Sequence, residues 1–575
     1  MDSSSKTLNA MMQRLSLDPK LLCCNTSEAA MPCKNVGYMA CKGCLLVSYC
    51  SKNCQVAHWP IHRSDCRSIK TWKPAWIKEH RAPAFMNDSG SHGESYGAKK
   101  YLWGNVPAID VIQLEKNEGN NFREPLNLLF AASGDMRNTI LSVVNLPEYY
   151  TGRLDIVLND KEMDIVARNV VFLLVFLVED DPIIAAEHVL HIWYSTLITE
   201  SCYNLLQSKL RPMVEDVCNK IGHRIGSSLL AKTWSFGSTS VRLVLSRDEW
   251  FSLRSYFDVP RGLTKDAAQR VRQGVMLAPE RVDYVDRSLC LKSPSERLGM
   301  FKFRSDGMLL PFGHTRAVFT IPNPTVFNSI DEWPMMDSSD PTSGWSLESF
   351  LKLDIGPARH DIYGKLHHYL RQLFASFHYR LRSLPVVFEF LRVDARSLHK
   401  HTETKFDRID VSNITDGYYL GIHDTLEKIG PLLQPTVINR HATLIALFLN
   451  AVPEMAAYME SGIIPVQAKH KEKLEKIMRY MPELMLPDPA NMIKIMMAMS
   501  LVQDMDGHFG LYMSVHNCED TALRVGLQIK AVHTIIEPWP MRIDPEPTDQ
   551  AKEYFALLLS SSHTGQERYV EWSRR

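Results

Sequence analysis

The sequence has no excess charge of either sign and no long apolar run. Its 65 Lys and Arg residues balance 65 Asp and Glu residues over 575 positions, so it lacks the general attraction for polyanions on which non-specific nucleic-acid binding depends. The longest purely apolar run, residues 170–178, is about half of the roughly 20 residues that cross a bilayer. Residues 1–20 lack the apolar core of a signal peptide. We expect no nucleic-acid partner, no membrane anchor and a cytoplasmic or nuclear location.

Cysteine is scarce over most of the chain. Eight of the 12 cysteines lie between residues 23 and 66, and the other four are scattered between residues 202 and 518. Scattered single cysteines are typical of buried thiols that pack like small apolar residues. The dense group favours metal-bound thiolates in a reducing compartment over a disulfide framework.

The cysteine-rich segment has the ligand spacing of a structural zinc module. Its pairs are CxxC, CxxxC and HxxxC, formed by Cys41 and Cys44, by Cys50 and Cys54, and by His62 and Cys66. Four thiolate or imidazole ligands close a tetrahedral zinc site and leave no position for a substrate. With Cys24 and Cys33 the segment supplies ligands for two structural zinc ions, and metal catalysis is not expected there.

The string SYCSKNCQVAHWPIHRSDC, residues 48–66, resembles the MYND zinc finger. The resemblance implies interleaved ligands, in which the first and third pairs share one ion and the second and fourth pairs share the other. One ion then takes Cys24, Cys33, Cys50 and Cys54, and the other takes Cys41, Cys44, His62 and Cys66.

Two ligand positions have alternatives. The family's first pair is usually a tight CxxC, whereas eight residues separate Cys24 from Cys33 here, so Cys23 is an alternative to Cys24. His58 is the alternative histidine. The spacing to Cys66 favours His62, which leaves His58 for packing or hydrogen bonding.

A protein partner is implied by the same resemblance. MYND fingers hold short proline-containing peptides, and strand addition with an apolar pocket is the physical basis of such binding. Gln55 and Trp59 lie where the family presents peptide contacts, although a purely structural role fits both residues equally well. We therefore predict a zinc-dependent interaction or scaffold protein.

The clearest α/β pattern begins at residue 126. Residues 126–132 and 154–158 are apolar runs typical of buried strands, and residues 136–146 and 164–178 have helical patterns. Strand, glycine turn, helix and a second strand that ends in an acid form the opening of a Rossmann-like unit. Residues 385–395 and 406–416 contain further strand-like runs.

A nucleotide-like ligand is the alternative to a purely structural α/β unit. Only Gly134 represents the three glycines of a dinucleotide fingerprint, and Asp135 would repel a phosphate at the helix start. S-adenosylmethionine, which has no pyrophosphate, suffers less from this repulsion. Asp160 follows Gly134 by 26 residues, near the usual place of a ribose-binding carboxylate.

Polar residues after the later strand extend this candidate site. Asn413 and Asp416 are expected to meet Asp160 at one crevice if both strands belong to one sheet, since ligands bind beyond the carboxyl ends of parallel strands. Helix capping is the other role that such residues commonly have. The candidate cofactor residues are Gly134, Asp160 and Asn413, and the alternative function is a methyltransferase.

The remaining segments favour helices. His188 and His191 lie three residues apart on one predicted helix face, where core packing is the expected role and a metal pair the alternative. The last third, from residues 442–452 onward, is helical in pattern and rich in methionine. The expected divisions are a flexible N-terminus (1–20), a zinc finger (21–68), a connector and loop (69–98), a first α/β part (99–180), a helical insertion (181–384), a second α/β part (385–455) and a mainly helical C-terminal region (456–575).

A second resemblance involves the strings LWGNVPAIDVIQLEKNEG, LNLLFAASGDMRNTI and IVLNDKEMDIVARNVVFLL, within residues 102–174. They are similar to fungal MYND-finger proteins with an uncharacterised domain, which is shared with the N-terminal part of the axonemal dynein assembly factor three family. The resemblance implies a methyltransferase-like α/β scaffold and a role in protein assembly, and it does not imply catalysis. No SET-domain string is present.

Overall fold

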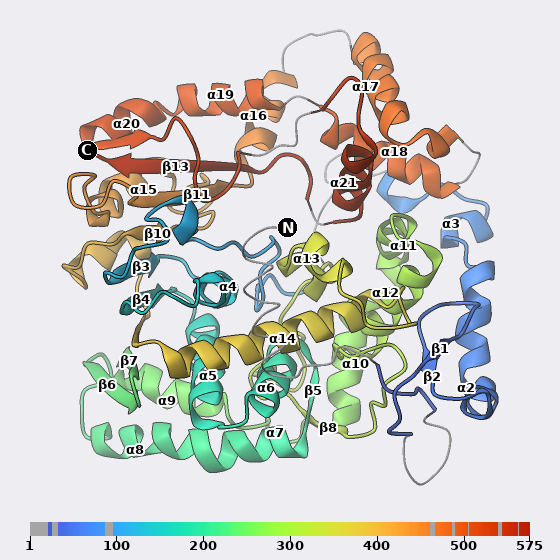
Figure 1. The fold of residues 1–575 in the computed structure, drawn as a ribbon, viewed down its shortest axis with the longest axis horizontal. Coiled ribbons are helices and arrows are strands. Elements are labelled where there is room, and N and C mark those ends of the chain that lie inside the picture. The colour runs from blue at the N-terminus through green and yellow to red at the C-terminus, as the bar shows by residue number, and fades with distance from the viewer. Residues whose placement is uncertain are drawn as a thin grey trace.

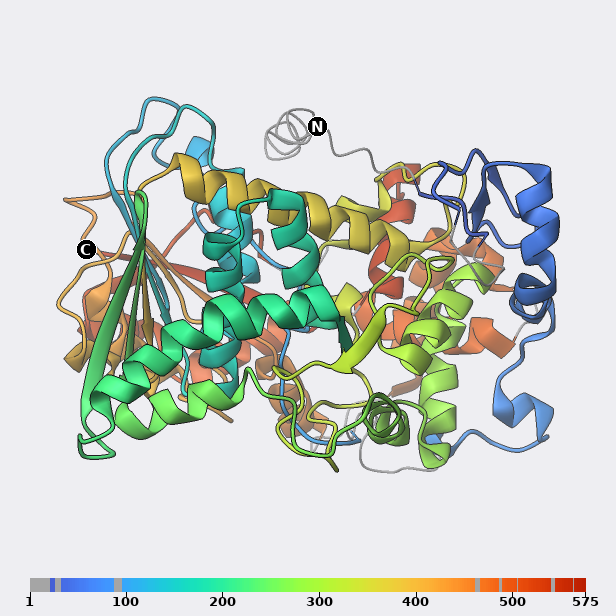
Figure 2. The ribbon, with the colours of Figure 1, turned by 90° about the horizontal axis from the view of Figure 1, so that it is seen from below.

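The computed structural model has a large mixed β-sheet at one end of the molecule and the cysteine-rich module at the other, with helices between them (Figure 1 and Figure 2). No helix in the described part of the chain is long and apolar enough to cross a bilayer. The expected flexible segment 1–20 lies outside the described residues. The structure describes residues 21–25, 33–86, 96–460, 466–485, 489–503, 505–538, 543–561 and 563–575.

The main sheet has nine strands among the described residues, and its six middle strands, from β11 to β7, are parallel. β13 is antiparallel to both of its neighbours, and β6 closes the opposite edge as a hairpin with β7. The order across the sheet is β12 (Leu527–Ile529), β13 (Arg568–Arg574), β11 (Thr443–Phe448), β10 (Arg408–Asp410), β3 (Leu126–Phe130), β4 (Leu154–Asn159), β9 (Val386–Leu391), β7 (Thr239–Ser246) and β6 (Leu229–Phe236).

The middle strands are apolar because both faces of the sheet are covered. In β3, Leu128 and Phe130 pack into one hydrophobic core and Leu129 packs into the core on the opposite face. The first core contains α4 (Arg137–Asn145), α5 (Met163–Val178), α6 (Pro182–Tyr194) and α14 (Ile362–Ser383). The second contains α15 (Ile422–Lys428), α19 (Asp506–Val515) and α20 (Cys518–Arg524).

The strands and helices predicted for residues 126–178 are confirmed, with ends that differ by one or two residues. The helical prediction for residues 442–452 is wrong, because residues 443–448 form β11 and only the last residues of that range begin α16. All six residues of β11 are buried. A continuous apolar run has neither the period of a helix nor that of a half-exposed strand, so periodicity does not distinguish the two.

The segment 181–384 is mostly helical and also contributes strands. β6 and β7 join the main sheet beside β9, and β5 (Leu197–Thr199) pairs with β8 (Phe319–Pro322) in a separate two-stranded sheet. β7 alternates between buried and more exposed residues, as expected for a strand near a sheet edge. The further helices are α7 (Glu200–Leu205), α8 (Arg211–Ile221), α9 (Arg247–Ser255), α10 (Lys265–Met276), α11 (Val282–Cys290), α12 (Pro294–Asp306) and α13 (Leu347–Leu351).

The C-terminal region combines helices with the last two strands of the sheet. β12 and β13 complete one edge, which a mainly helical pattern does not predict. β12 has only three residues, and β13 mixes charged residues with apolar ones, so neither has the apolar run of a central strand. The further helices here are α16 (Ala451–Glu460), α17 (Val466–Tyr480), α18 (Pro489–Leu501) and α21 (Asp549–Ser560).

The cysteine-rich module is docked against the large region. It consists of a hairpin, β1 (Met39–Ala40) and β2 (Ser48–Tyr49), followed by α2 (Lys52–Thr71) and α3 (Ala75–Lys78). The Ser295 hydroxyl on α12 donates to the Cys44 carbonyl over 2.7 Å, and the His360 N–H donates to the Leu45 carbonyl over 3.1 Å. Phe312 packs into the core of the module. The module is therefore fixed to the large region by hydrogen bonds and apolar contact.

A buried ion pair holds the short strand β10. The Arg408 side chain is 0% exposed, and its Nη2 contacts both oxygens of Glu118, which is 2% exposed, at 2.8 and 2.7 Å. The same guanidinium donates to the carbonyls of Ile112 and His441. A buried charge that loses its partner costs about 3–5 kcal/mol.

We predict that Glu118→Ala lowers the free energy of unfolding by about 3–5 kcal/mol, because it leaves the Arg408 charge buried and uncompensated. Urea denaturation followed by tryptophan fluorescence measures this change. Glu348→Ala, which removes an exposed pair with Lys352, is the matched control and should change stability by less than about 0.5 kcal/mol. A loss below about 1 kcal/mol for Glu118→Ala would contradict the structural role of the pair.

Candidate functional site

The metal-ligating side chains of the N-terminal module gather into two groups. The ligand atoms of each group lie within 4.8 Å of one another. One group is Cys23, Cys33, Cys50 and Cys54, and the other is Cys41, Cys44, His62 and Cys66. The interleaved arrangement implied by the sequence resemblance is therefore present, with one change of residue.

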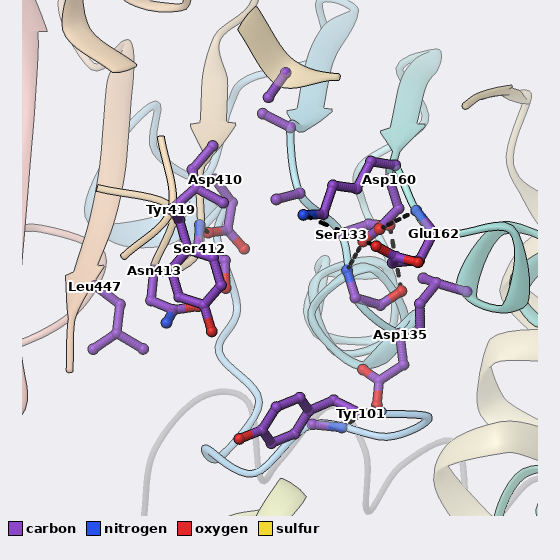
Figure 3. Close-up of a pocket in the computed structure, with 18 of the residues that line it drawn as sticks. Tyr101, Ser133, Asp135, Asp160, Glu162, Asp410, Ser412, Asn413, Tyr419 and Leu447 are labelled. Carbon is purple, nitrogen blue, oxygen red and sulfur yellow. Dashed lines mark hydrogen bonds and ion pairs between the residues drawn. The ribbon is translucent and has the colours of Figure 1, made fainter. Parts of the chain in front are cut away.

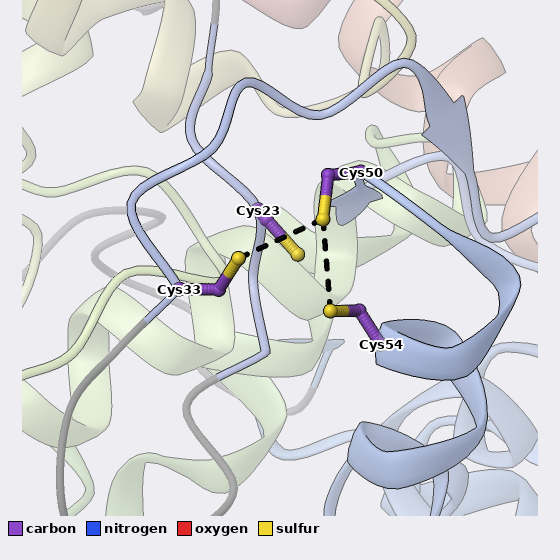
Figure 4. A group of neighbouring side chains, drawn as sticks. All are labelled: Cys23, Cys33, Cys50 and Cys54. Atoms are coloured by element: carbon purple, nitrogen blue, oxygen red, sulfur yellow. Dashed lines mark hydrogen bonds between the residues drawn. The ribbon is translucent and has the colours of Figure 1, made fainter.

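The change concerns the first ligand, which is Cys23 and not the expected Cys24. The thiols of Cys23, Cys33, Cys50 and Cys54 point toward one another (Figure 4), and Cys50 Sγ lies 3.6 Å from the sulfurs of both Cys33 and Cys54. The geometry thus favours the alternative that the spacing left open.

Local backbone direction explains the correction. The Cys23 N–H donates to the Asn35 carbonyl, whereas the Cys24 N–H donates to the Ser48 carbonyl, each over 2.8 Å. In extended backbone, neighbouring side chains point in opposite directions. The Cys24 thiol consequently packs against Gly313 of the large region, where an added Cβ would lie 2.1 Å from its sulfur.

The second group agrees with the sequence-based ligand set. Cys41 Sγ lies 3.7 Å from Cys66 Sγ, and Cys44 Sγ lies 3.3 Å from His62 Nε2. All four residues of this group are buried. His58 is not a ligand, because its Nδ1 pairs with the Tyr49 hydroxyl over 3.0 Å and its ring stacks on His62.

The spacing of the sulfurs fits zinc. Zinc–sulfur bonds of about 2.3 Å place the sulfurs of a tetrahedral site about 3.8 Å apart. The observed sulfur–sulfur distances of 3.6 and 3.7 Å are close to this edge length. Each group supplies four ligands, so both sites are closed and suit structural zinc rather than metal catalysis.

A second candidate site is a cavity of about 890 Å³ beyond the carboxyl ends of the parallel strands. It is lined by the ends of β4, β10 and β11 and by the loops after β3 and β9. It lies where the strand order reverses, because β3 has β4, the next strand along the chain, on one side and the much later β10 on the other. Figure 3 shows Ser133, Asp160 and Glu162 on one side of this space and Asp410, Ser412 and Asn413 on the other. Open α/β sheets bind ligands at such switch points.

Gly134 and Asp160 meet at this cavity. Gly134 has a φ of 53°, which glycine adopts at low cost, and its N–H donates to Asp160 Oδ2 over 3.0 Å. The other oxygen of Asp160 accepts the Glu162 N–H over 3.0 Å. Burial raises the pKa of Asp160 to about 6, against the lowering effect of these two donors. The acid thus joins the turn after β3 to the end of β4.

Asn413 lines the same cavity, but Asp416 does not. Asp416 accepts the backbone N–H groups of Leu449 and Asn450 and therefore fixes the loop after β11. Ser412, just before Asn413, has a φ of 50°, a strained value for a residue with a side chain. Asp160 and Asn413 therefore line one cavity from opposite sides, whereas Asp416 has a structural role nearby.

The sequence patterns did not identify the segment 99–107, which also lines the cavity. Asp135, expected to repel phosphate, accepts the Gly104 N–H over 2.8 Å and pairs with Arg137 Nε over 2.7 Å. Tyr101 extends from this segment toward the cavity opposite Tyr419 (Figure 3). The string LWGN next to Tyr101 has no periodicity, so no sequence signal connected it to residue 135.

His188 and His191 on α6, for which a metal pair was the alternative to core packing, have different surroundings. His191 lies beside Glu187 and beside His367 of α14, and the ligand atoms of these three residues are within 4.8 Å of one another. His188 does not belong to this group. The two histidines three residues apart therefore do not form a pair, and the partners of His191 come from positions one helical turn away and from another helix.

We predict that Cys23→Ser loses one zinc ion per chain relative to the unsubstituted protein, because it removes one of four ligands from a closed site. Zinc content is measured by inductively coupled plasma mass spectrometry on the purified full chain. Cys24→Ser is the matched control and should retain the full zinc content. Loss of zinc in Cys24→Ser with retention in Cys23→Ser would restore Cys24 as the ligand.

Comparison with known families agrees with the geometry of the N-terminal module. Residues 23–66, which begin and end at a ligand, match the MYND finger family. Residues 102–198, from the segment over the cavity to β5, match a domain of unknown function, DUF4470. No curated protein and no solved structure matches the chain significantly. The chain therefore carries a MYND zinc finger, a module that generally mediates protein–protein interaction, followed by a DUF4470 domain.

Proposed function

We propose that this protein is a zinc-dependent interaction protein whose MYND finger binds a proline-containing peptide of a partner. The observation that carries the proposal is a groove of about 1200 Å³ beside the finger. Its walls are residues 39–43 along β1, the face of α2 that carries Gln55, Val56 and Trp59, and residues 354–359 of the large region. Gln55 and Trp59, which lie where the family presents peptide contacts, both line it.

The chemistry of the groove supports an extended apolar peptide. Trp59 is 39% exposed, Val56 is 61% exposed and Met39 is 39% exposed, so apolar surface is gathered at one place. β1 pairs only with β2 among the described strands, which leaves its other edge for strand addition. An exposed indole suits proline, because a polyproline helix is already extended and loses little entropy on binding.

The charged residues that line the groove are mostly basic, which favours a partner peptide with an acidic residue. Lys42, Lys52 and Arg359 line it together with one acid, Asp354. We infer a peptide that carries an acidic residue beside its apolar positions, since opposite charge favours association. The thiolate ligands of the finger favour a reducing compartment, the cytoplasm or the nucleus. A role in protein assembly, implied by the resemblance to the dynein assembly factor family, fits such an interaction protein.

We predict that Trp59→Ala weakens peptide binding by about 2 kcal/mol, roughly 30-fold in Kd, because an aromatic side chain exposed in the wall of a groove commonly contributes much of the binding energy. Peptides are selected by display on the zinc-loaded full chain and titrated by fluorescence anisotropy. Ile61→Ala is the control, because Ile61 is exposed on the same helix but does not line the groove. Equal affinity of the selected peptides for Trp59→Ala would refute the proposed site.

The strand-end cavity favours a second candidate function, a Rossmann-like, methyltransferase-like domain that binds S-adenosylmethionine. The supporting observation is the position of the cavity at the switch point between β4, β3 and β10, with Gly134, Asp160 and Asn413 around it. In the proposed complex Asp160 accepts hydrogen bonds from the ribose hydroxyls. Asn413 and Tyr101, across the cavity, contact the rest of the nucleoside.

The charges at the strand ends favour such a ligand over a phosphate. Asp160, Asp410 and Asp135 lie at three loops around the cavity, and carboxylates near a helix start oppose an anion. Asp135 is neutralised by Arg137, but Asp160 and Asp410 are bonded only to neutral donors. The negative charge of these carboxylates attracts a ligand that has a positive sulfonium group and no phosphate.

We predict that Asp160→Asn weakens S-adenosylmethionine binding at least about tenfold, because it removes a charged hydrogen-bond acceptor while keeping the shape of the side chain. Isothermal titration calorimetry on the zinc-loaded full chain measures the affinity. Asp155→Asn, at the opposite end of β4, is the control and should bind as the unsubstituted protein does. Absence of saturable binding at millimolar ligand would refute the second candidate, and unchanged affinity would exclude Asp160.

A further inference from the structure

A third group of potential metal ligands lies far from the finger in sequence. Glu187 and His191 lie one turn apart on α6, and His367 is on α14. Residues four apart on a helix lie on the same face, so the first two side chains converge on one spot. His367 reaches that spot from the neighbouring helix.

The distances fit a tetrahedral metal site. Glu187 Oε2 lies 3.6 Å from His191 Nε2 and 3.4 Å from His367 Nε2. Zinc bonds to imidazole nitrogen and carboxylate oxygen of about 2.1 Å place such ligand atoms about 3.4 Å apart in a tetrahedron. The distances from this carboxylate oxygen to the two histidine nitrogens are therefore close to those that a zinc ion bound by all three atoms would impose.

His367 supplies an independent sign of a ligand. Its side chain is 5% exposed, and its Nε2 lies 3.4 Å from Glu187 Oε2 but makes no hydrogen bond among the described residues. Buried polar groups almost always make hydrogen bonds, so a buried Nε2 that faces a carboxylate and a second imidazole without a hydrogen bond calls for an explanation. A metal ion bound at Nε2 provides one.

The neighbouring contacts orient the other two ligands. His191 Nδ1 pairs with the Ser195 hydroxyl over 2.9 Å, which leaves Nε2 facing Glu187. Ligating histidines usually have such a partner at the second nitrogen. Arg371 Nε lies 2.7 Å from Glu187 Oε1, so the other oxygen, Oε2, is the one left toward the histidines. Glu187 is 33% exposed, which gives a metal access from solvent.

We propose that Glu187, His191 and His367 form a third zinc site, separate from the two finger sites, with a fourth coordination position left for water. Two histidines and one glutamate with an open position form a donor set that zinc accepts when it has an exchangeable ligand. The site lies between α6 and α14, inside the insertion of the α/β region. It depends neither on the peptide groove nor on the strand-end cavity.

The test is the zinc content of the full chain after dialysis against metal-free buffer, measured by inductively coupled plasma mass spectrometry. The unsubstituted protein should retain three zinc ions per chain, and Glu187→Gln and His367→Gln should each retain two. His188→Gln, on the same helix and outside the cluster, should retain three. Two zinc ions in the unsubstituted protein, or three in both cluster variants, would overturn the proposal.

A cobalt titration keeps the test decisive if His367→Gln fails to fold. Cobalt is added to protein whose two finger sites hold zinc, and visible absorption is recorded for the unsubstituted protein, Glu187→Gln and His188→Gln. One equivalent should give d–d bands without the thiolate charge-transfer bands of a cysteine site. These bands should be lost in Glu187→Gln and kept in His188→Gln. Thiolate bands, or equal binding by Glu187→Gln, would overturn the assignment.

Discussion

The parallel pairing of six strands constrains where the polar side chains of the large region lie. Both faces of these strands are covered by helices, so the side chains along them are mostly apolar and polar groups collect at the strand ends. At the strand ends these polar side chains form hydrogen bonds with backbone groups of the loops. Asn159 donates to the Ala131 and Val393 carbonyls, Asp160 accepts two N–H groups and Asp410 accepts the Ser412 N–H. The groups that stabilise the loops therefore also line the cavity.

The long helix α14 connects the separate sites of the molecule. It begins just after His360, whose N–H donates to the Leu45 carbonyl of the finger, and it carries His367 in its second turn. It ends at Ser383, three residues before β9, and the loop after β9 lines the cavity. A partner in the groove would contact residues 354–359, immediately before this helix. The finger and the α/β domain are thus joined by one continuous packed element.

Sequence patterns correctly predicted those helices and strands that are marked by a short apolar run with a clear end. The strands and helices between residues 126 and 178 follow from apolar runs that end at a glycine turn or an acid. The residues 443–448 have an equally apolar run, but only pairing with β10 and β13 makes them a strand. β13 depends on such pairing even more, since its charged residues hide the strand period. Propensity does not decide such cases, because tertiary hydrogen bonds override it.

The sequence by itself determined the zinc chemistry, because ligand spacing within one short segment already limits which side chains reach one ion. It left Cys23 and Cys24 as alternatives, and the tertiary structure chose Cys23 by directing Cys24 toward Gly313. The sequence placed Asp160 and Asn413 at one crevice only on the condition that their strands share a sheet, which the tertiary structure decided. The tertiary structure alone brought Glu187 to His367 and residues 354–359 beside the finger. These neighbours are far apart in the chain, and strand order and helix packing, not local spacing, bring them together.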